Sequence, residues 1–190
     1  MRRVLWIAAA GAVVAVIGLG LSQAGGGEAG DGANFDLGAA KMALQGAPAP
    51  LAALHEQSSE LLGGGQEALD ARLRALRGHP VVVNVWGSWC PPCRAEFPIF
   101  QALGTSRGKE IAFLGIDTVD PSDRARAYLE DFPLPYPSYS DPRGNLARSV
   151  GGIGGAPVTS FYDAAGKRVH VKQGGYRRAA DLEADLEQYL

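Results

Sequence analysis

The two cysteines of the 190-residue chain, Cys90 and Cys93, are the residues whose type and spacing point most directly to chemistry. They are separated by two prolines and follow a β-branched run, at the start of a helix-length segment. The first amides of a helix lack backbone partners and carry partial positive charge, so they favour a thiolate over a thiol. We therefore expect Cys90 to be the attacking sulfur and Cys93, one turn into the helix, to be the resolving sulfur of a redox pair.

Other uses of a Cys-x-x-Cys pair fit the sequence less well. A structural disulfide seldom lies where a strand passes into a helix. Covalent haem attachment requires a histidine after the second cysteine, and Arg94 occupies that position. A metal site needs two further ligands, and the three histidines stand at no recognisable ligand spacing: His55, His79 and His170. We expect no metal and no organic cofactor, with the redox-active Cys90–Cys93 disulfide as the working group.

The cysteines lie between two segments that predict buried parallel strands. Residues 81–85, which are valines except for Asn84, and the apolar run 111–116 are typical of strands covered on both faces. A strand, a helix and a second strand in this order predict a parallel pair with a right-handed crossover. A further helix is predicted before the first strand, at 66–77, where leucines recur at helical spacing and a glycine follows.

The second half of the chain predicts an antiparallel edge and more helices. Residues 158–162 and 168–172 are strand candidates separated by a glycine-containing loop, which suits a hairpin. Helical patterns occupy three other segments: 123–132, 145–150 and 181–190. These elements predict an α/β fold, with a mixed central sheet and helices on both faces.

The amino-terminal residues predict export from the cytoplasm. Arg2 and Arg3 precede 18 uncharged residues, 4–21, which as a helix would span roughly 27 Å at ~1.5 Å per residue. This length favours an uncleaved membrane anchor over a cleaved signal segment, although 22–24 would pass as a cleavage site. Positive flanks stay inside, so the catalytic domain is expected on the extracytoplasmic side of the cell membrane, attached by a single span.

Composition divides the chain into three parts and excludes one class of partner. We expect an anchor or signal segment at 1–23, a flexible linker rich in glycine, alanine and proline at 24–50, and one domain at 51–190. The 18 basic and 20 acidic residues leave a net charge of −2. Without a basic excess or a run of like charge, nucleic acid is not an expected partner.

The stretch from Val81 to Pro98, VVVNVWGSWCPPCRAEFP, resembles the thioredoxin superfamily. Within it, the chain is most similar to the membrane-anchored ResA/TlpA/CcmG (DsbE)-like branch, and the resemblance extends over about 72–190. It implies a thioredoxin-like three-layer sandwich that reduces or exchanges disulfides outside the cytoplasm, often in cytochrome c maturation. It also implies exported protein thiols or disulfides as clients and a membrane protein as electron donor or acceptor.

The resemblance assigns roles to several residues besides the cysteines. Pro157 matches the cis-proline that faces the dithiol, and the backbone of Ala156 before it is then available to pair with an extended client segment. Trp89 matches a residue of the site wall, whereas Trp86 fits core packing as well. Pro98 matches the proline that kinks the active-site helix.

Proton handling is expected to differ from that of ordinary thioredoxin. Thioredoxins place a buried aspartate six positions before the first active cysteine, and here that position is Asn84, which cannot take a proton. The resemblance offers Glu96 instead, three residues after Cys93 and on the same helix face. An exposed helix charge is the alternative interpretation of Glu96.

These observations predict an extracytoplasmic thiol:disulfide oxidoreductase. The direction of electron flow stays open between a reductase, acting on apocytochrome c or related clients, and an oxidase that forms disulfides. A noncatalytic adaptor that only holds an extended peptide is the rival from another class. A thiol peroxidase is a weaker rival, since Cys90 follows a tryptophan rather than lying in a threonine-containing loop.

Overall fold

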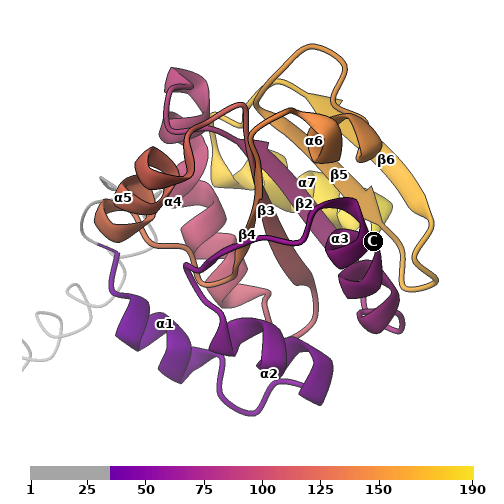
Figure 1. Ribbon diagram of the computed structural model, residues 1–190. Helices are drawn as coiled ribbons and strands as arrows, with labels where there is room; N and C mark the ends of the chain where they lie inside the picture. Colours follow the sequence, from indigo (N-terminus) through magenta and orange to yellow (C-terminus); the bar gives the residue numbers. More distant parts are fainter. Residues whose placement is uncertain (1–34) are drawn as a thin grey trace, which may run out of the picture.

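The computed structural model describes residues 35–190, which fold around one six-stranded sheet (Figure 1). The strand order is β1-β4-β3-β2-β5-β6. The strands are β1 (Leu61–Leu62), β2 (Val81–Trp86), β3 (Ala112–Thr118), β4 (Ser138–Asp141), β5 (Val158–Tyr162) and β6 (Arg168–Gln173). The helices are α1 (Leu37–Ala43), α2 (Ala49–Glu56), α3 (Gly65–Ala75), α4 (Pro91–Ser106), α5 (Ser122–Asp131), α6 (Asn145–Ser149) and α7 (Ala179–Tyr189).

The central strand β2 joins the parallel and antiparallel halves of the sheet. It runs parallel to β3 and antiparallel to β5, which in turn forms an antiparallel pair with β6. All of its residues are buried, as expected for a β-branched run covered on both faces. The predicted parallel pair, its helical crossover and the carboxyl-terminal hairpin are therefore confirmed.

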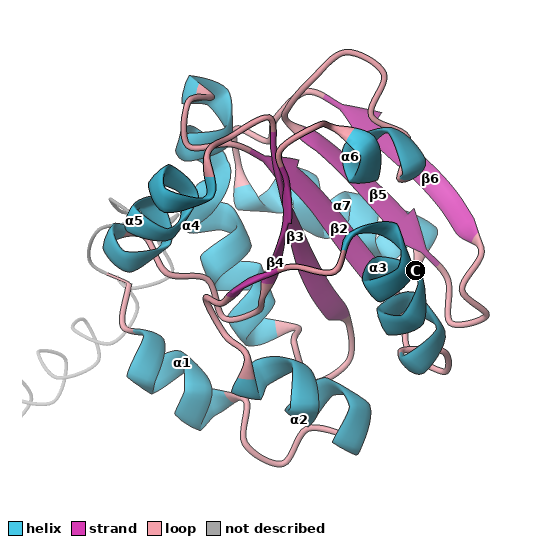
Figure 2. Cartoon of the chain, viewed as in Figure 1, coloured by secondary structure: helices cyan, strands magenta, loops and turns pink. Residues whose placement is uncertain are grey.

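Helices cover both faces of the sheet, so the predicted three-layer α/β sandwich is confirmed (Figure 2). On one face, α4, α5 and α7 bury aromatic and aliphatic side chains around Trp86 and Phe97. On the other face, α2, α3 and α6 bury a cluster of leucines and valines. Each fully buried side chain of this size contributes about 1.5–3 kcal/mol, and the two clusters fix the positions of the strand ends.

The predicted linker at 24–50 is wrong over residues 37–50. The short helix α1 lies there and α2 begins there at Ala49, and Ala40 and Leu44 are buried against the domain. Asp36 begins α1 by accepting a hydrogen bond from the amide of Ala39 at 2.9 Å, and Pro48 stands at the start of α2, where a missing amide hydrogen costs little. Composition indicated a flexible chain because few side chains here are large. Residues 24–34 lie outside the described residues.

The predicted anchor at 1–23 also lies outside the described residues. Within residues 35–190, no helix has the length and apolar character needed to cross a bilayer.

Candidate functional site

The two cysteines form a disulfide at the amino terminus of α4. Their Cα atoms are 5.3 Å apart, and Cys90 is the residue that caps the helix, with Pro91 and Pro92 in its first turn. The amide of Cys93 donates a hydrogen bond to Cys90 Sγ at 3.3 Å. The same amide would stabilise a thiolate on Cys90 after reduction, because a hydrogen bond to the charged form favours it.

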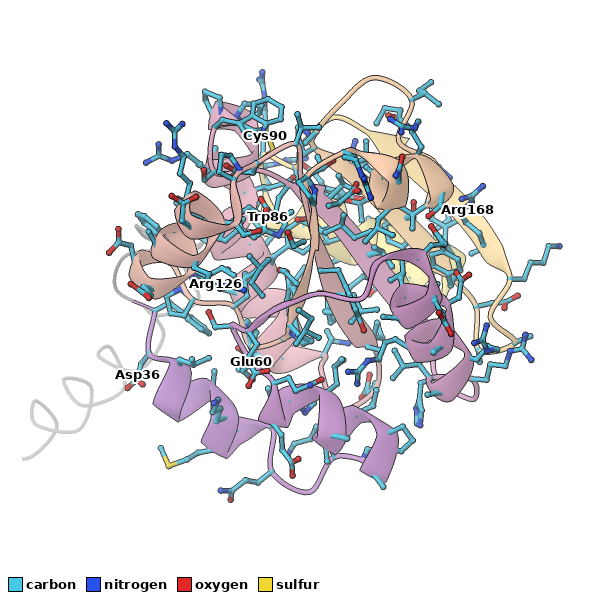
Figure 3. The ribbon with its side chains drawn as sticks, in the orientation of Figure 1. Asp36, Glu60, Trp86, Cys90, Arg126 and Arg168 are labelled. Atoms are coloured by element: carbon cyan, nitrogen blue, oxygen red, sulfur yellow. A yellow bond between two sulfur atoms is a disulfide. The ribbon has the colours of Figure 1, made fainter. Side chains whose placement is uncertain are left out.

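The disulfide is covered by its surroundings. Only 1% of the surface of Cys90 is exposed, and Cys93 is fully buried. Figure 3 shows Cys90 at the upper end of the molecule, with Trp86 below it towards the interior. Very little of the Cys90 surface is therefore open to a partner sulfur in the oxidised protein.

Pro157 follows a cis peptide bond with Ala156, as predicted. Pro157 lies directly before β5. Gly175 lies between Pro157 and α4, so its contacts show how close the two are. A Cβ atom added to Gly175 would lie 3.2 Å from Pro157 Cγ, 3.2 Å from Glu96 Oε2 and 3.5 Å from the carbonyl oxygen of Pro92. The proline loop, the start of α4 and the carboxylate therefore meet at one point.

Glu96 is a buried side chain rather than an exposed helix charge. Its Oε1 accepts a hydrogen bond from Asn84 Nδ2 at 2.9 Å, and its Oε2 accepts one from the amide of Tyr176 at 2.9 Å. Burial raises the pKa of Glu96 to about 7, against the lowering effect of these two bonds and of Lys172. One turn beyond Cys93, the chain thus holds a carboxyl group that gains and loses a proton near neutral pH.

Trp89 lies at the surface beside the disulfide. It is 48% exposed, and its Nε1 donates to the carbonyl oxygen of Thr118 at 3.1 Å. Its indole lies against Gly87, where an added Cβ would be 2.5 Å from Trp89 Nε1. Trp86 is fully buried and donates from Nε1 to Ser138 Oγ at 3.1 Å, which assigns it to the core.

An open cavity of about 520 Å³ begins at Thr118, the residue that holds Trp89, and extends along the proline loop. Gly155, two residues before Pro157, also lines it. Val119 and Ile153 form its rim and are strongly exposed, at 59% and 88%. This apolar rim could not be predicted from the sequence, because its members come from loops far apart in the chain and follow no periodic pattern.

Three further groups near the site could not be predicted from the sequence. The backbone amide of Tyr176 and the side chain of Lys172 act on Glu96 from the β6–α7 region. Asp120 contacts the turn before Cys90 from the loop after β3. None of the three has a local sequence signal, since backbone amides, single lysines and single aspartates occur in most proteins at many positions.

The three histidines make no metal site with other residues in the part of the chain that the structure describes. His55 is buried on α2, and His170 stacks on Tyr189 at 3.9 Å between ring centroids. In residues 35–190, no group of three or more histidine, cysteine or acidic side chains is arranged to hold a metal ion.

The chain resembles known proteins over most of this domain. A family model described as the AhpC/TSA family matches residues 46–171. The thiol:disulfide interchange protein DsbE of Pseudomonas fluorescens is 40% identical over 92 residues, which cover 48% of this chain and 49% of that protein. The thiol:disulfide interchange protein HelX of Rhodobacter capsulatus is 34% identical over 132 residues, which cover 70% of this chain and 69% of the relative.

A solved structure gives the same picture of the fold. The thioredoxin-family thiol:disulfide interchange protein of Chlorobium tepidum superposes with a TM-score of 0.54 and 26% identity, over 61% of this chain and 83% of that one. Residues 46–171, which the family model matches, contain both cysteines and the cis-proline loop. With P. fluorescens DsbE, by contrast, the alignment spans about half the length of the relative (49%).

Proposed function

The chain belongs to the AhpC/TSA family and, within it, to the thioredoxin-like thiol:disulfide interchange proteins, and on that premise we propose that it exchanges disulfides with exported proteins through Cys90 and Cys93. The observation that carries this proposal is the disulfide at the start of α4, three residues from a buried carboxyl group and beside a cis-proline loop. No organic cofactor is needed, because the two sulfurs themselves store the electron pair.

The geometry supports a two-step exchange. In the reduced protein, the Cys90 thiolate attacks a client disulfide, so that a mixed disulfide forms and one client sulfur leaves and takes up a proton. The Cys93 thiolate then attacks Cys90 Sγ, which breaks the mixed disulfide, releases the second client thiol and restores the Cys90–Cys93 bond. Two electrons pass to the client, and the reverse sequence forms a disulfide in it.

Glu96 is the group that we assign to proton handling in these steps. Cys93 has to lose its proton before it can attack, and it is buried away from water. The neighbouring carboxyl group has a pKa raised to about 7, so it is partly ionised at neutral pH and can accept a proton from the Cys93 thiol directly or through one water molecule.

The client is expected to bind as an extended segment. The backbone at Ala156, before the cis bond, is half-buried and can pair with a client strand next to the sulfurs. The exposed indole of Trp89 and the apolar cavity rim formed by Val119 and Ile153 suit an apolar side chain of that segment. We assign these residues to client recognition.

We place the domain outside the cytoplasm, held by a single amino-terminal span at 1–23. The support is Arg2 and Arg3 followed by the uncharged residues 4–21. The favoured direction is reduction of exported clients, among them apocytochrome c, with electrons supplied by a membrane partner. Oxidation of client thiols is the alternative, and equilibration with glutathione separates the two by the measured reduction potential.

Trapping with Cys93→Ser tests the proposal. Without the resolving sulfur, the client should remain on Cys90 as a mixed disulfide that is released by a reductant. The matched control is Cys90→Ser with Cys93→Ser, which should trap nothing. If the double variant keeps full biological activity, the protein acts as a peptide-binding adaptor and the exchange proposal is wrong. Turnover of hydrogen peroxide would instead indicate a thiol peroxidase.

A further inference from the structure

The turn before Cys90 is fastened to the loop that follows β3. Within the turn, the amide of Cys90 donates to the carbonyl oxygen of Gly87 at 3.0 Å. Two more bonds cross to the other loop: the amide of Ser88 donates to Asp120 Oδ2 at 2.7 Å, and Trp89 Nε1 donates to the carbonyl oxygen of Thr118. The position of the attacking cysteine therefore depends on residues 118–120.

The anchoring loop has an unusual backbone. Val119 has a φ of 52°, a left-handed conformation that β-branched residues rarely adopt. Its amide is held by the carbonyl oxygen of Asp141 at 3.0 Å. This conformation turns the chain so that the carbonyl oxygen of Thr118 and the side chain of Asp120 both face the cysteine turn.

Asp117 lies directly behind this anchor, and it is fully buried. Both of its carboxyl oxygens, and Oδ1 of Asp120, receive no hydrogen bond from any group in residues 35–190. Two ionised carboxylates have no hydrogen to offer each other. A proton on Asp117 supplies the missing donor, and it allows Asp117 to donate to the side chain of Asp120.

The surroundings of Asp117 favour the protonated form. On the neighbouring strands its register partners are Trp86 and Ser140, both uncharged. The acidic side chain of β4, Asp141, accepts bonds from Thr118 Oγ1 and from two amides of α6. Burial first, then Asp120 and Asp141, raise the pKa of Asp117 to about 8. From α5, Asp123 adds a further exposed acidic group in the first turn.

We propose that Asp117 and Asp120 form a proton-sharing carboxyl pair that positions the turn at residues 87–90, and with it Cys90, for exchange. Neither carboxylate touches the sulfurs, so both are positioning residues. While the proton is present, Asp120 is held by Asp117 on one oxygen and by Ser88 on the other. When the proton is lost, two buried negative charges repel each other, and Asp120 shifts away from the amide that it fixes.

This inference rests on the proposed exchange function, but its test does not depend on it. In the oxidised protein neither cysteine titrates, so the amide resonance of Ser88 reports on the anchor alone. We expect this resonance to show a titration step close to pH 8 in the unaltered chain and in Glu96→Gln. The step should be lost in Asp117→Asn, whose amide donates to Asp120 at every pH, and retained in the exposed control Asp123→Asn.

Two further measurements complete the test. Carboxyl-carbon resonances of the unaltered protein should contain one aspartate that titrates close to pH 8, which requires no variant to fold. At each pH, the exchange rate of the unaltered protein with a protein disulfide is divided by the rate of Asp117→Asn. This ratio should fall severalfold between pH 7 and pH 9. A Ser88 resonance that stays constant from pH 6 to pH 9, or aspartates that all titrate in the acidic range, would overturn the proposal even where exchange activity is intact.

Discussion

At the scale of single residues, the site combines a sulfur pair with a carboxyl group that ionises near neutral pH. Both cysteines could be assigned from the sequence, because a Cys-x-x-Cys motif between an apolar strand and a helix is seldom anything but a redox pair. The cis bond at Pro157 followed from family resemblance and is confirmed. The burial of Glu96 could not be derived from spacing alone, since it depends on Tyr176, 80 positions away.

Replacing Glu96 by glutamine should change how the exchange rate depends on pH. The amide keeps the shape and the bond from Tyr176, but it cannot hold the proton of Cys93. We expect the inflection near pH 7 to disappear and the rate at neutral pH to fall at least about tenfold. The pH profile of reduction of a protein disulfide measures this. The exposed Glu67→Gln on α3 is the control, and an E96Q profile that overlays the parent would remove the assigned role.

Replacing Ile153 by serine should affect clients but not small disulfides. Ile153 is 88% exposed and lies on the rim of the cavity that extends along the proline loop. We expect the KM for an unfolded protein client to rise severalfold with kcat unchanged, and the rate with oxidised glutathione to stay the same. Val169→Ser, on the outer strand β6, serves as the control. Equal losses with both substrates would argue against a client surface here.

At the scale of elements, the long apolar runs were predictable and the short polar ones were not. β2 and β3 have continuous buried runs, and their boundaries agree with the sequence pattern within two residues. The strand β4 reads Ser-Tyr-Ser-Asp, which has no apolar periodicity, and it is held by pairing with β3 and β1. The helices α1 and α2 could not be predicted because many of their side chains are small. The domain therefore begins before residue 51, where composition placed its start.

The capping residue of α1 offers a direct test of that correction. Asp36→Ala removes the carboxylate that accepts from Ala39, and we expect the free energy of unfolding to fall by about 1 kcal/mol. Denaturant unfolding of the parent chain and of the variant, under the same conditions, measures the change. Asp36→Asn keeps a capping acceptor and should cost only a small part of it. Unchanged stability in Asp36→Ala would mean that α1 contributes little to the fold.

At the scale of the whole molecule, two buried carboxyl groups tie stability to pH. Burial raises the pKa of Glu96 to about 7 and that of Asp117 to about 8. The folded chain therefore keeps protons that the unfolded chain has already lost. Folding stability is greatest at acidic pH, where both groups are protonated in the folded and in the unfolded chain. It falls as pH rises through the range between the unfolded and the folded pKa values.

The effect of the two carboxyl groups is best measured between pH 6.5 and pH 8. His55, whose pKa is lowered by burial, acts in the opposite sense, and its contribution fades as pH rises above 6.5, the ordinary histidine pKa. We expect the free energy of unfolding to fall with a slope of up to about 1.4 kcal/mol per pH unit for each retained proton. Denaturant midpoints measured across the window check this. The slope should be shallower in E96Q and shallower again when Asp117→Asn is added.

The close contacts around Gly175 limit which residues can replace this glycine. A methyl group there already presses on the proline loop and on the buried carboxylate, and the first turn of α4 lies just beyond them. A side chain larger than a methyl group would separate the proline loop, the Glu96 carboxylate and the first turn of α4 from one another. A residue that takes part in no step of the chemistry should thus be sensitive to replacement by large side chains, because it keeps these three parts of the site in contact.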